Sequence, residues 1–284
     1  MYEQQAGHKR VYNRCVRSSP KGLSSPIAEG RTAEIYLWGD GHVLKLYRDW
    51  CPPDWVEYEA RIARIVYEAG IPSPAVSEIV DVNGRRGLIY QRLEGITMVQ
   101  DLKGRPWMLW KHAHSLAELQ CKIHEKSTIG LPSYKDRLRT DIDETLYLPE
   151  ALRRKAKDTL TQLPDDQNIC HGDFHPENVL ITKTGPVVID WMTARSGSPW
   201  ADLARTSLLL TIGVKAATRQ IPLFLRMMVR LFHHAYLQRY HLLRADTKNE
   251  MRHWTTLIAA ARLNENIVPE REALIKIVRD DFAE

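Results

Sequence analysis

The spacing of apolar residues predicts strands at the start of the chain. Two apolar runs, EIYLW and HVLKLY, flank the sequence GDG within residues 26–48, a pattern that predicts a β-hairpin. Residues 52–70 begin with two prolines, repeat apolar residues at helical spacing and end in glycine, which predicts a helix. Residues 71–95 return to strand-like alternation around an Asn-Gly turn. The first ninety or so residues therefore predict an antiparallel sheet with one inserted helix.

Helical spacing dominates from about residue 105 onward, with one short β region around residues 170–190. We therefore predict an α+β protein with a small sheet lobe, residues 1–92, and a larger, mainly helical C-terminal lobe, residues 93–284. The sequence YQRLEG is the predicted hinge between them. Residues 1–24 are polar, and we expect an arm or an edge strand there.

Composition and charge narrow the class of protein. The chain has 284 residues, a net charge of +5 and four scattered cysteines without a CxxC pair, which favours reduced thiols in a cytoplasmic protein. No apolar run is long enough to cross a membrane, and the first residues lack the apolar stretch of a secretory signal. The basic cluster from Lys9 to Lys21 is interpreted as part of the arm. A nucleic-acid binder would carry a clustered basic face, so that function is disfavoured.

The densest group of reactive side chains lies in CHGDFHPENVLIT, residues 170–182, and VVIDW follows at residues 187–191. A loop followed by a hairpin brings Asp173, Asn178 and Asp190 to one edge. Carboxylate and amide oxygens suit Mg²⁺, which in turn bridges phosphates. Phosphoryl transfer also needs a carboxylate that orients the attacking hydroxyl. Asp173 fits that role, and Asn178 and Asp190 fit the metal. Alone, Asp173 or Asn178 would be read as a turn former or a helix cap, but the complete string favours chemistry.

The string resembles the protein-kinase catalytic loop H-R-D-L-x-x-x-N, with Gly172 in place of the arginine. It is more similar to the HGDxxxxNxL … xxIDW signature of the aminoglycoside phosphotransferase and choline kinase superfamily, whose members are small-molecule kinases with the protein-kinase fold. The likeness extends over residues 26 to about 210. The family's Asp-Leu-Ala segment matches PWADLART, in which Asp202 is expected to support the catalytic loop. The resemblance implies a protein-kinase-like fold with ATP (or GTP) and Mg²⁺ as cofactors.

The same resemblance implies a lysine on the third strand paired with a glutamate of the inserted helix. Lys45 lies in the apolar strand HVLKLY, where a buried charge needs a partner. Glu59 is the expected partner because it shares a helical face with Ile62 and Val66. Glu57 competes, but Glu59 matches the family position better. The alternative is an exposed edge strand beside a solvated helix.

Three further nucleotide contacts rest on the resemblance alone. The segment EGRTAEIY has one glycine instead of the three of a kinase phosphate loop, and Thr32 would offer its hydroxyl or backbone N–H to a phosphate. The hinge IYQRLEG resembles the adenine-binding segment, in which backbone groups of Gln91 and Leu93 would face the base.

The departures from protein kinases disfavour a protein substrate. His175 occupies the position at which Ser/Thr kinases carry lysine, DWM stands where D-F-G is found, and no A-P-E follows. Two interpretations of His175 stay open: a contact with substrate or phosphate, and a packed loop histidine. His171 is expected to bond the backbone near Asp190, and His124 is expected to pack in the core.

The predicted function is transfer of the γ-phosphate to a hydroxyl of a small molecule, with an aminoglycoside, amino alcohol, sugar or homoserine-like acceptor. Residues 198–284 contain thirteen Lys and Arg against nine Asp and Glu, and this balance disfavours a polycationic aminoglycoside. A non-catalytic kinase-like nucleotide-binding protein is the alternative, and a protein kinase is a weaker one. The sequence predicts no membrane partner, and it leaves the oligomeric state undetermined.

Overall fold

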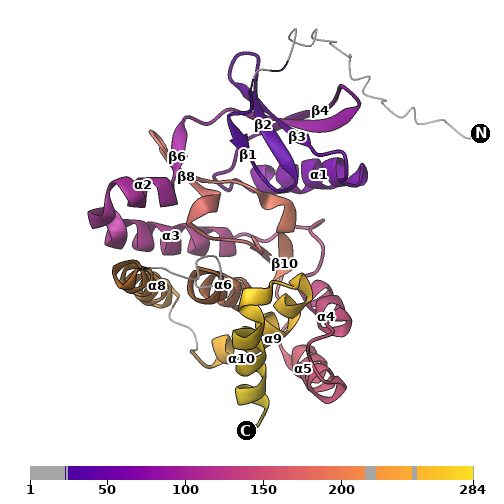
Figure 1. Ribbon diagram of the computed structural model, residues 1–284, viewed down its shortest axis with the longest axis vertical. Coiled ribbons are helices and arrows are strands. Elements are labelled where there is room, and N and C mark those ends of the chain that lie inside the picture. Colours follow the sequence, from indigo (N-terminus) through magenta and orange to yellow (C-terminus); the bar gives the residue numbers. More distant parts are fainter. Residues whose placement is uncertain (1–22, 24, 215–221, 245–247, 284) are drawn as a thin grey trace, which may run out of the picture.

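The computed structural model describes residues 23, 25–214, 222–244 and 248–283. The arm or edge strand predicted for residues 1–24 falls on residues that the structure does not describe, apart from Leu23. A sheet lobe lies above a larger helical lobe along the long axis of the molecule (Figure 1). The predicted α+β, protein-kinase-like fold is confirmed.

The N-terminal lobe contains one five-stranded antiparallel sheet with the order β1-β2-β3-β5-β4. The sheet contains two hairpins, one closed by the GDG turn and the other by the Asn-Gly turn, as the sequence predicted. Its elements are β1 (Ala28–Glu29), β2 (Ala33–Trp38), β3 (His42–Tyr47), α1 (Asp54–Glu68), β4 (Val76–Val82) and β5 (Arg85–Gln91).

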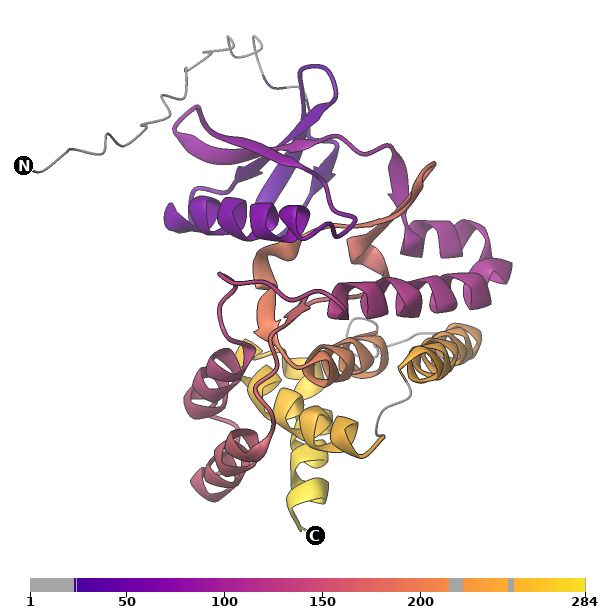
Figure 2. The same cartoon turned by 180° about the vertical axis from the view of Figure 1, so that it is seen from behind.

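Helix α1 covers the face of this sheet that is turned toward the C-terminal lobe (Figure 2). Gly70, at φ +76°, follows the end of the helix with a backbone conformation that other residues rarely adopt. Val56 and Ala60 of α1 are buried in one cluster with Tyr47 of β3 and Leu88 of β5. This packing fixes the helix against the strands that carry the candidate nucleotide-binding residues.

The C-terminal lobe is mainly helical, as predicted, and a single large apolar core unites its helices. Its longer helices are α2 (Met98–Gly104), α3 (Leu109–His124), α4 (Tyr134–Glu144), α5 (Glu150–Gln162), α6 (Pro199–Leu208), α8 (Leu223–Leu243), α9 (Lys248–Arg262) and α10 (Arg271–Ala283). None of the helices in the described ranges is long and apolar enough to cross a membrane.

Five short strands lie in the upper part of this lobe. Four of them lie within or next to the β region that the sequence predicted around residues 170–190, and the fifth follows the hinge. They are β6 (Gly95–Thr97), β7 (Asn168–Cys170), β8 (Val179–Thr182), β9 (Gly185–Val188) and β10 (Arg195–Gly197). Strands β8 and β9 form a hairpin, and β6, which comes directly after the hinge, pairs with β8. The chain thus enters the second lobe immediately beside the candidate catalytic residues.

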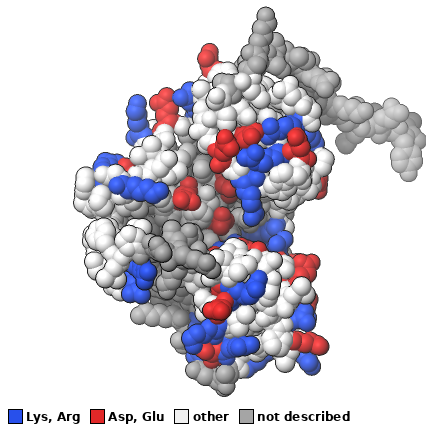
Figure 3. Space-filling model, in the orientation of Figure 1, with Lys and Arg blue, Asp and Glu red and all other residues white. Residues whose placement is uncertain are grey.

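Direct contacts tie α1 to the C-terminal lobe. Arg61 donates to the carbonyl oxygen of Gly130 (2.6 Å), and Arg195 donates to the hydroxyl of Tyr58 (2.5 Å). These contacts hold the helix that carries Glu59 against the lobe that carries the candidate catalytic loop. On the face seen in Figure 3, basic and acidic side chains are intermixed over both lobes, which agrees with the modest net charge.

Candidate active site

The candidate catalytic loop begins where β7 ends, and its backbone depends on a glycine. Gly172 has φ +78°, and a Cβ built there would lie 2.6 Å from the carbonyl oxygen of Thr193. A larger residue would therefore combine backbone strain with a steric clash. This conformation lets the chain turn sharply between His171 and Asp173.

Asp202 of α6 anchors the loop from below. Its carboxylate accepts hydrogen bonds from the backbone N–H groups of His171 (3.2 Å) and Gly172 (2.7 Å). Gln120 donates to it at 3.1 Å and His124 at 3.0 Å. Burial disfavours the ionised Asp202, but these donors outweigh burial and lower its pKa. The supporting role expected for Asp202 is visible in these contacts.

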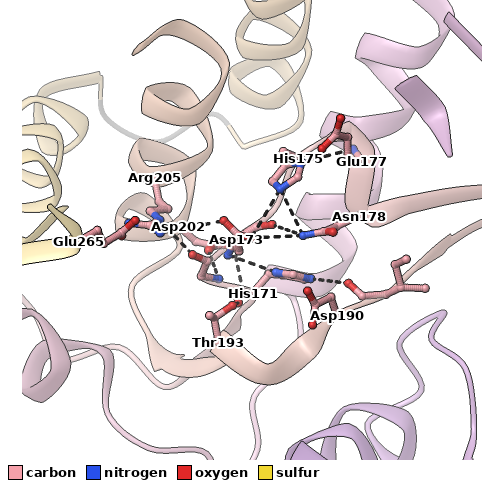
Figure 4. A network of polar contacts seen from close by, with 12 residues as sticks. His171, Asp173, His175, Glu177, Asn178, Asp190, Thr193, Asp202, Arg205 and Glu265 are labelled. Carbon is pink, nitrogen blue, oxygen red and sulfur yellow. Dashed lines mark hydrogen bonds and ion pairs between the residues drawn. The ribbon is translucent and has the colours of Figure 1, made fainter. Parts of the chain in front are cut away.

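Asp173 lies at the open end of the loop, with its carboxylate one-third exposed. His175 Nε2 is 3.5 Å from Oδ2, and Arg205 Nη2 is 4.0 Å from Oδ1 (Figure 4). Burial opposes ionisation of Asp173, but the His175 contact and the Arg205 charge outweigh it and lower the pKa. The group is therefore an ionised acceptor at neutral pH.

The two expected metal ligands become neighbours through the β8–β9 hairpin. The backbone N–H of Ile189 donates to the carbonyl oxygen of Asn178 (3.0 Å), which places Asp190 next to Asn178. Asp190 has φ +62°, an uncommon conformation for a residue other than glycine, and it exposes about half of its carboxylate (51%). His171 Nε2 donates to the Ile189 carbonyl at 3.1 Å, so the backbone bond expected near Asp190 is present.

The Lys45–Glu59 pair predicted from the sequence is present. Lys45 Nζ lies 2.8 Å and 3.0 Å from the two carboxylate oxygens of Glu59, and 3.2 Å from Asp190 Oδ1. Glu59 is 1% exposed, whereas Glu57 pairs with Arg86 near the surface. Burial disfavours the Lys45 ammonium, but the charges of Glu59 and Asp190 outweigh burial and raise its pKa. Lys45 thus joins the sheet lobe to Asp190, just after the β8–β9 hairpin.

The other three predicted nucleotide-contact residues lie in the β1–β2 turn and in the hinge. Thr32 lies in the β1–β2 turn, where its carbonyl oxygen accepts from the N–H of Arg48 (2.9 Å). In the hinge, the N–H of Gln91 donates to the carbonyl oxygen of Ala75 (2.8 Å), and Leu93 follows two residues later. The nucleotide contacts of Thr32, Gln91 and Leu93 therefore stay predictions.

His175 takes a local structural position. Its Nδ1 accepts from the backbone N–H of Glu177 (3.3 Å) and so caps the short helix that ends at Asn178. The other ring nitrogen, Nε2, faces both Asp173 (3.5 Å) and the side-chain amide nitrogen of Asn178 (3.3 Å). The ring serves as a loop cap, and its second nitrogen is turned toward the candidate base and the candidate metal ligand Asn178.

Arg205 is a site residue that the sequence reasoning missed. It donates from Nε to the carbonyl oxygen of Gly172 (3.1 Å) and forms an ion pair with Glu265. This places a cation beside Asp173 and connects the loop to the C-terminal helices (Figure 4). A signal was available, because Arg205 follows Asp202 by three residues and so lies on the same face of a helix.

A sheet lobe with a lysine–glutamate pair, placed over a loop with Asp173, Asn178 and Asp190, defines a protein of the kinase-like class. Residues 24–254 match the model of the phosphotransferase enzyme family. The chain therefore belongs to this phosphotransferase family, as the resemblance in the sequence indicated. No curated protein matches the chain significantly.

Solved structures share the fold at low sequence identity. A thermostable mutant of aminoglycoside phosphotransferase APH(4)-Ia, in complex with AMP-PNP and hygromycin B, is 20% identical with a TM-score of 0.65, over 94% of this chain and 96% of that chain. A choline/ethanolamine kinase family protein from Mesorhizobium loti is 16% identical, with a TM-score of 0.59 over 93% of this chain and 88% of its own. Aminoglycoside-3'-phosphotransferase of type VIII is 19% identical, with a TM-score of 0.59 over 87% and 94%.

Proposed function

We propose that this protein transfers the γ-phosphate of ATP or GTP, with Mg²⁺, to a hydroxyl group of a small molecule. One observation carries the proposal. Asp173, Asn178 and Asp190 lie together at one edge of the C-terminal lobe, and Lys45 of the other lobe reaches that edge at 3.2 Å from Asp190. This is the set of groups that phosphoryl transfer requires.

The nucleotide would lie between the lobes. Lys45 would bind its α- and β-phosphates, and Glu59 would orient the lysine. Thr32 would contact a phosphate from the β1–β2 turn, and backbone groups of Gln91 and Leu93 would face the base. Each of these placements follows the family pattern, and the Lys45–Glu59 contact supports the first of them.

Asn178 and Asp190 fit a magnesium ion by the chemistry of their free atoms. The side-chain N–H₂ of Asn178 donates to the backbone carbonyl of Asp173 (2.9 Å), so the amide oxygen is the atom left for a cation. Asp190 adds a half-exposed carboxylate. Oxygen donors of this kind suit Mg²⁺. The bound ion would supply charge neutralisation for the phosphates.

Asp173 would position the acceptor hydroxyl and take its proton. The hydroxyl oxygen forms a bond to the γ-phosphorus as the bond between that phosphorus and the bridging oxygen of the nucleoside diphosphate breaks. The leaving oxygen departs on the diphosphate, and the hydroxyl proton moves to a carboxylate oxygen of Asp173. The protein contributes positioning and charge stabilisation rather than a covalent intermediate.

The acceptor is a small molecule in this proposal: an aminoglycoside, an amino alcohol, a sugar or a homoserine-like compound. The missing A-P-E segment and His175 disfavour a protein acceptor, and the basic balance of residues 198–284 disfavours a polycation. The proposal also places the protein in the cytoplasm, where nucleoside triphosphates and reduced thiols are both available.

We expect the purified protein to release nucleoside diphosphate when it is given ATP, Mg²⁺ and a member of an acceptor panel drawn from these four classes. Release should require Mg²⁺ and fall to background when EDTA is added or when Asp190 is replaced by asparagine. Mg²⁺-dependent nucleotide binding without release for any acceptor would favour the non-catalytic alternative. The absence of nucleotide binding would contradict both.

A further inference from the structure

The carboxylate of Glu59 has more hydrogen-bond donors than its ion pair with Lys45 requires. Tyr90 donates its hydroxyl to Oε1 at 2.7 Å, and Tyr47 donates its hydroxyl to Oε2. Lys45 contacts the same two oxygens. Both carboxylate oxygens of Glu59 therefore accept hydrogen bonds, from two phenol hydroxyls and one ammonium group.

The two tyrosines come from different strands but from one face of the sheet. Tyr47 is two residues after Lys45 on β3, and side chains two apart on a strand share a face. On the paired strand β5, Leu88 lies opposite Lys45 and Tyr90 lies opposite Val43, so Tyr90 points the same way. All of these side chains meet Glu59 from the direction of the sheet, while α1 holds Glu59 from the other side.

The hydroxyl of Tyr90 stays protonated next to Glu59. Burial and the neighbouring Glu59 charge raise the pKa of Tyr90 well above its ordinary value. A protonated hydroxyl next to an ionised carboxylate has one stable arrangement, in which the hydroxyl donates. The two hydroxyl groups, each placed to donate to one carboxylate oxygen, support Glu59 by geometry.

The hydrogen bonds of Lys45 show why the two tyrosine hydroxyl groups matter for nucleotide binding. An ammonium has three donors, and in this structure two point to Glu59 and one points to Asp190. A nucleotide phosphate must take at least one of them. When Lys45 turns toward a phosphate, a buried carboxylate without other donors would lose hydrogen bonds at a large energetic cost. Tyr47 and Tyr90 keep both oxygens of Glu59 satisfied during that change.

We propose that Tyr47 and Tyr90 are positioning residues for nucleotide binding, because their hydroxyl groups hold Glu59 in place and leave Lys45 available to the phosphates. This inference rests on the proposed role of Lys45 toward a nucleotide. The tyrosines act through Lys45 and touch no phosphate themselves. Replacement by phenylalanine removes only the hydroxyl and retains the Tyr47 ring, which lies 5.7 Å from the Lys45 ammonium.

The test is a double-mutant cycle on nucleotide affinity, which needs no acceptor. Isothermal titration calorimetry with AMP-PNP and Mg²⁺ compares wild type, Tyr47→Phe, Tyr90→Phe, the double phenylalanine variant, Lys45→Met and the combinations with Lys45→Met. Loss of both hydroxyls should weaken binding by about tenfold, because hydrogen bonds to a charged group are stronger than neutral ones and only part of their loss reaches the nucleotide. In the Lys45→Met background the same changes should have almost no effect.

Tyr36→Phe is the matched control. Tyr36 is also buried in this sheet and donates its hydroxyl to a glutamate, Glu34 (3.0 Å), but that pair lies on the other face. This control should bind the nucleotide like wild type. Thermal denaturation of each variant identifies any that is unfolded. If Tyr90→Phe or the double variant is unfolded, Tyr47→Phe carries the test, because Tyr47 does not adjoin the hinge in the sequence.

The outcomes separate this inference from the proposed function. Failure of wild type to bind AMP-PNP with Mg²⁺ would overturn the proposed function itself. A large effect of Lys45→Met with wild-type affinity in the tyrosine variants would overturn only the inference. An equal loss in both backgrounds would also overturn it, because the hydroxyls would then act independently of Lys45.

Discussion

Asp173→Asn should lower the turnover number for phosphoryl transfer by roughly a thousandfold, the scale of a lost general base. The change keeps the shape of the side chain but removes the negative charge that accepts the hydroxyl proton. The affinity for AMP-PNP with Mg²⁺ should stay within about threefold of wild type, since Lys45, Asn178 and Asp190 are unchanged. Steady-state kinetics with the acceptor found in the panel, together with calorimetry, measure the two quantities separately.

The matched control is Asp280→Asn, which removes an exposed carboxylate paired with Lys276 on the same helix. That variant should keep wild-type turnover. A turnover number for Asp173→Asn within a few fold of wild type would exclude Asp173 as the group that accepts the proton. A thousandfold loss accompanied by an equal loss of nucleotide affinity would show instead that the loop had collapsed.

Asp202→Ala should lower the free energy of unfolding by about 3–5 kcal/mol, because several buried donors lose their acceptor together. The substitution leaves the N–H groups of His171 and Gly172 without their acceptor, in a place that water does not reach. His124 loses its acceptor as well. Its ring is neutral because burial lowers its pKa, so Nε2 donates to Asp202 and Nδ1 accepts from the hydroxyl of Tyr240 (2.6 Å).

Thermal denaturation of Asp202→Ala should show a midpoint lower by about 10 °C, given the usual shift of a few degrees per kcal/mol for a chain of this size. Asp280→Ala is again the control and should change the midpoint by less than about 1 °C, because an isolated surface ion pair contributes little. A midpoint for Asp202→Ala within about 2 °C of wild type would show that the carboxylate does not anchor the loop.

Local sequence signals were sufficient for the N-terminal lobe and for the loop residues. The turns GDG and Asn-Gly, the prolines before α1 and Gly70 after it each act over a few residues, and each lies where it was expected. The Lys45–Glu59 pair was also accessible, because a charge inside an apolar strand and an acid on the buried face of a helix each require a partner.

Contacts between distant segments escaped the sequence. Strand β6 has only three residues, and it exists because it pairs with β8. Glu265 follows Arg205 by 60 residues, so nothing local indicates that it meets the cation beside Asp173. The tyrosines on Glu59 show the same limit, since the register between β3 and β5 decides that Tyr90 points toward it.

His124 illustrates a partial success. The sequence predicted a packed histidine, and the side chain is fully buried. The hydrogen bonds to Asp202 and Tyr240 depend on α6 and α8, which lie far away along the chain. The packed position was therefore predictable from the match to the family's Leu-His helix end, whereas the role of the ring in holding the candidate catalytic loop was not.

The central claim is catalytic transfer of a phosphoryl group to a small molecule, and incubation with γ-labelled ATP, Mg²⁺ and a deproteinised cell extract tests it most directly. New labelled compounds are identified by mass for wild type and for Asp173→Asn. The account predicts a labelled small-molecule phosphate that forms only with wild type and only with Mg²⁺. Label that appears equally with both proteins, or none from the extract or from the acceptor panel despite Mg²⁺-dependent nucleotide binding, would contradict it.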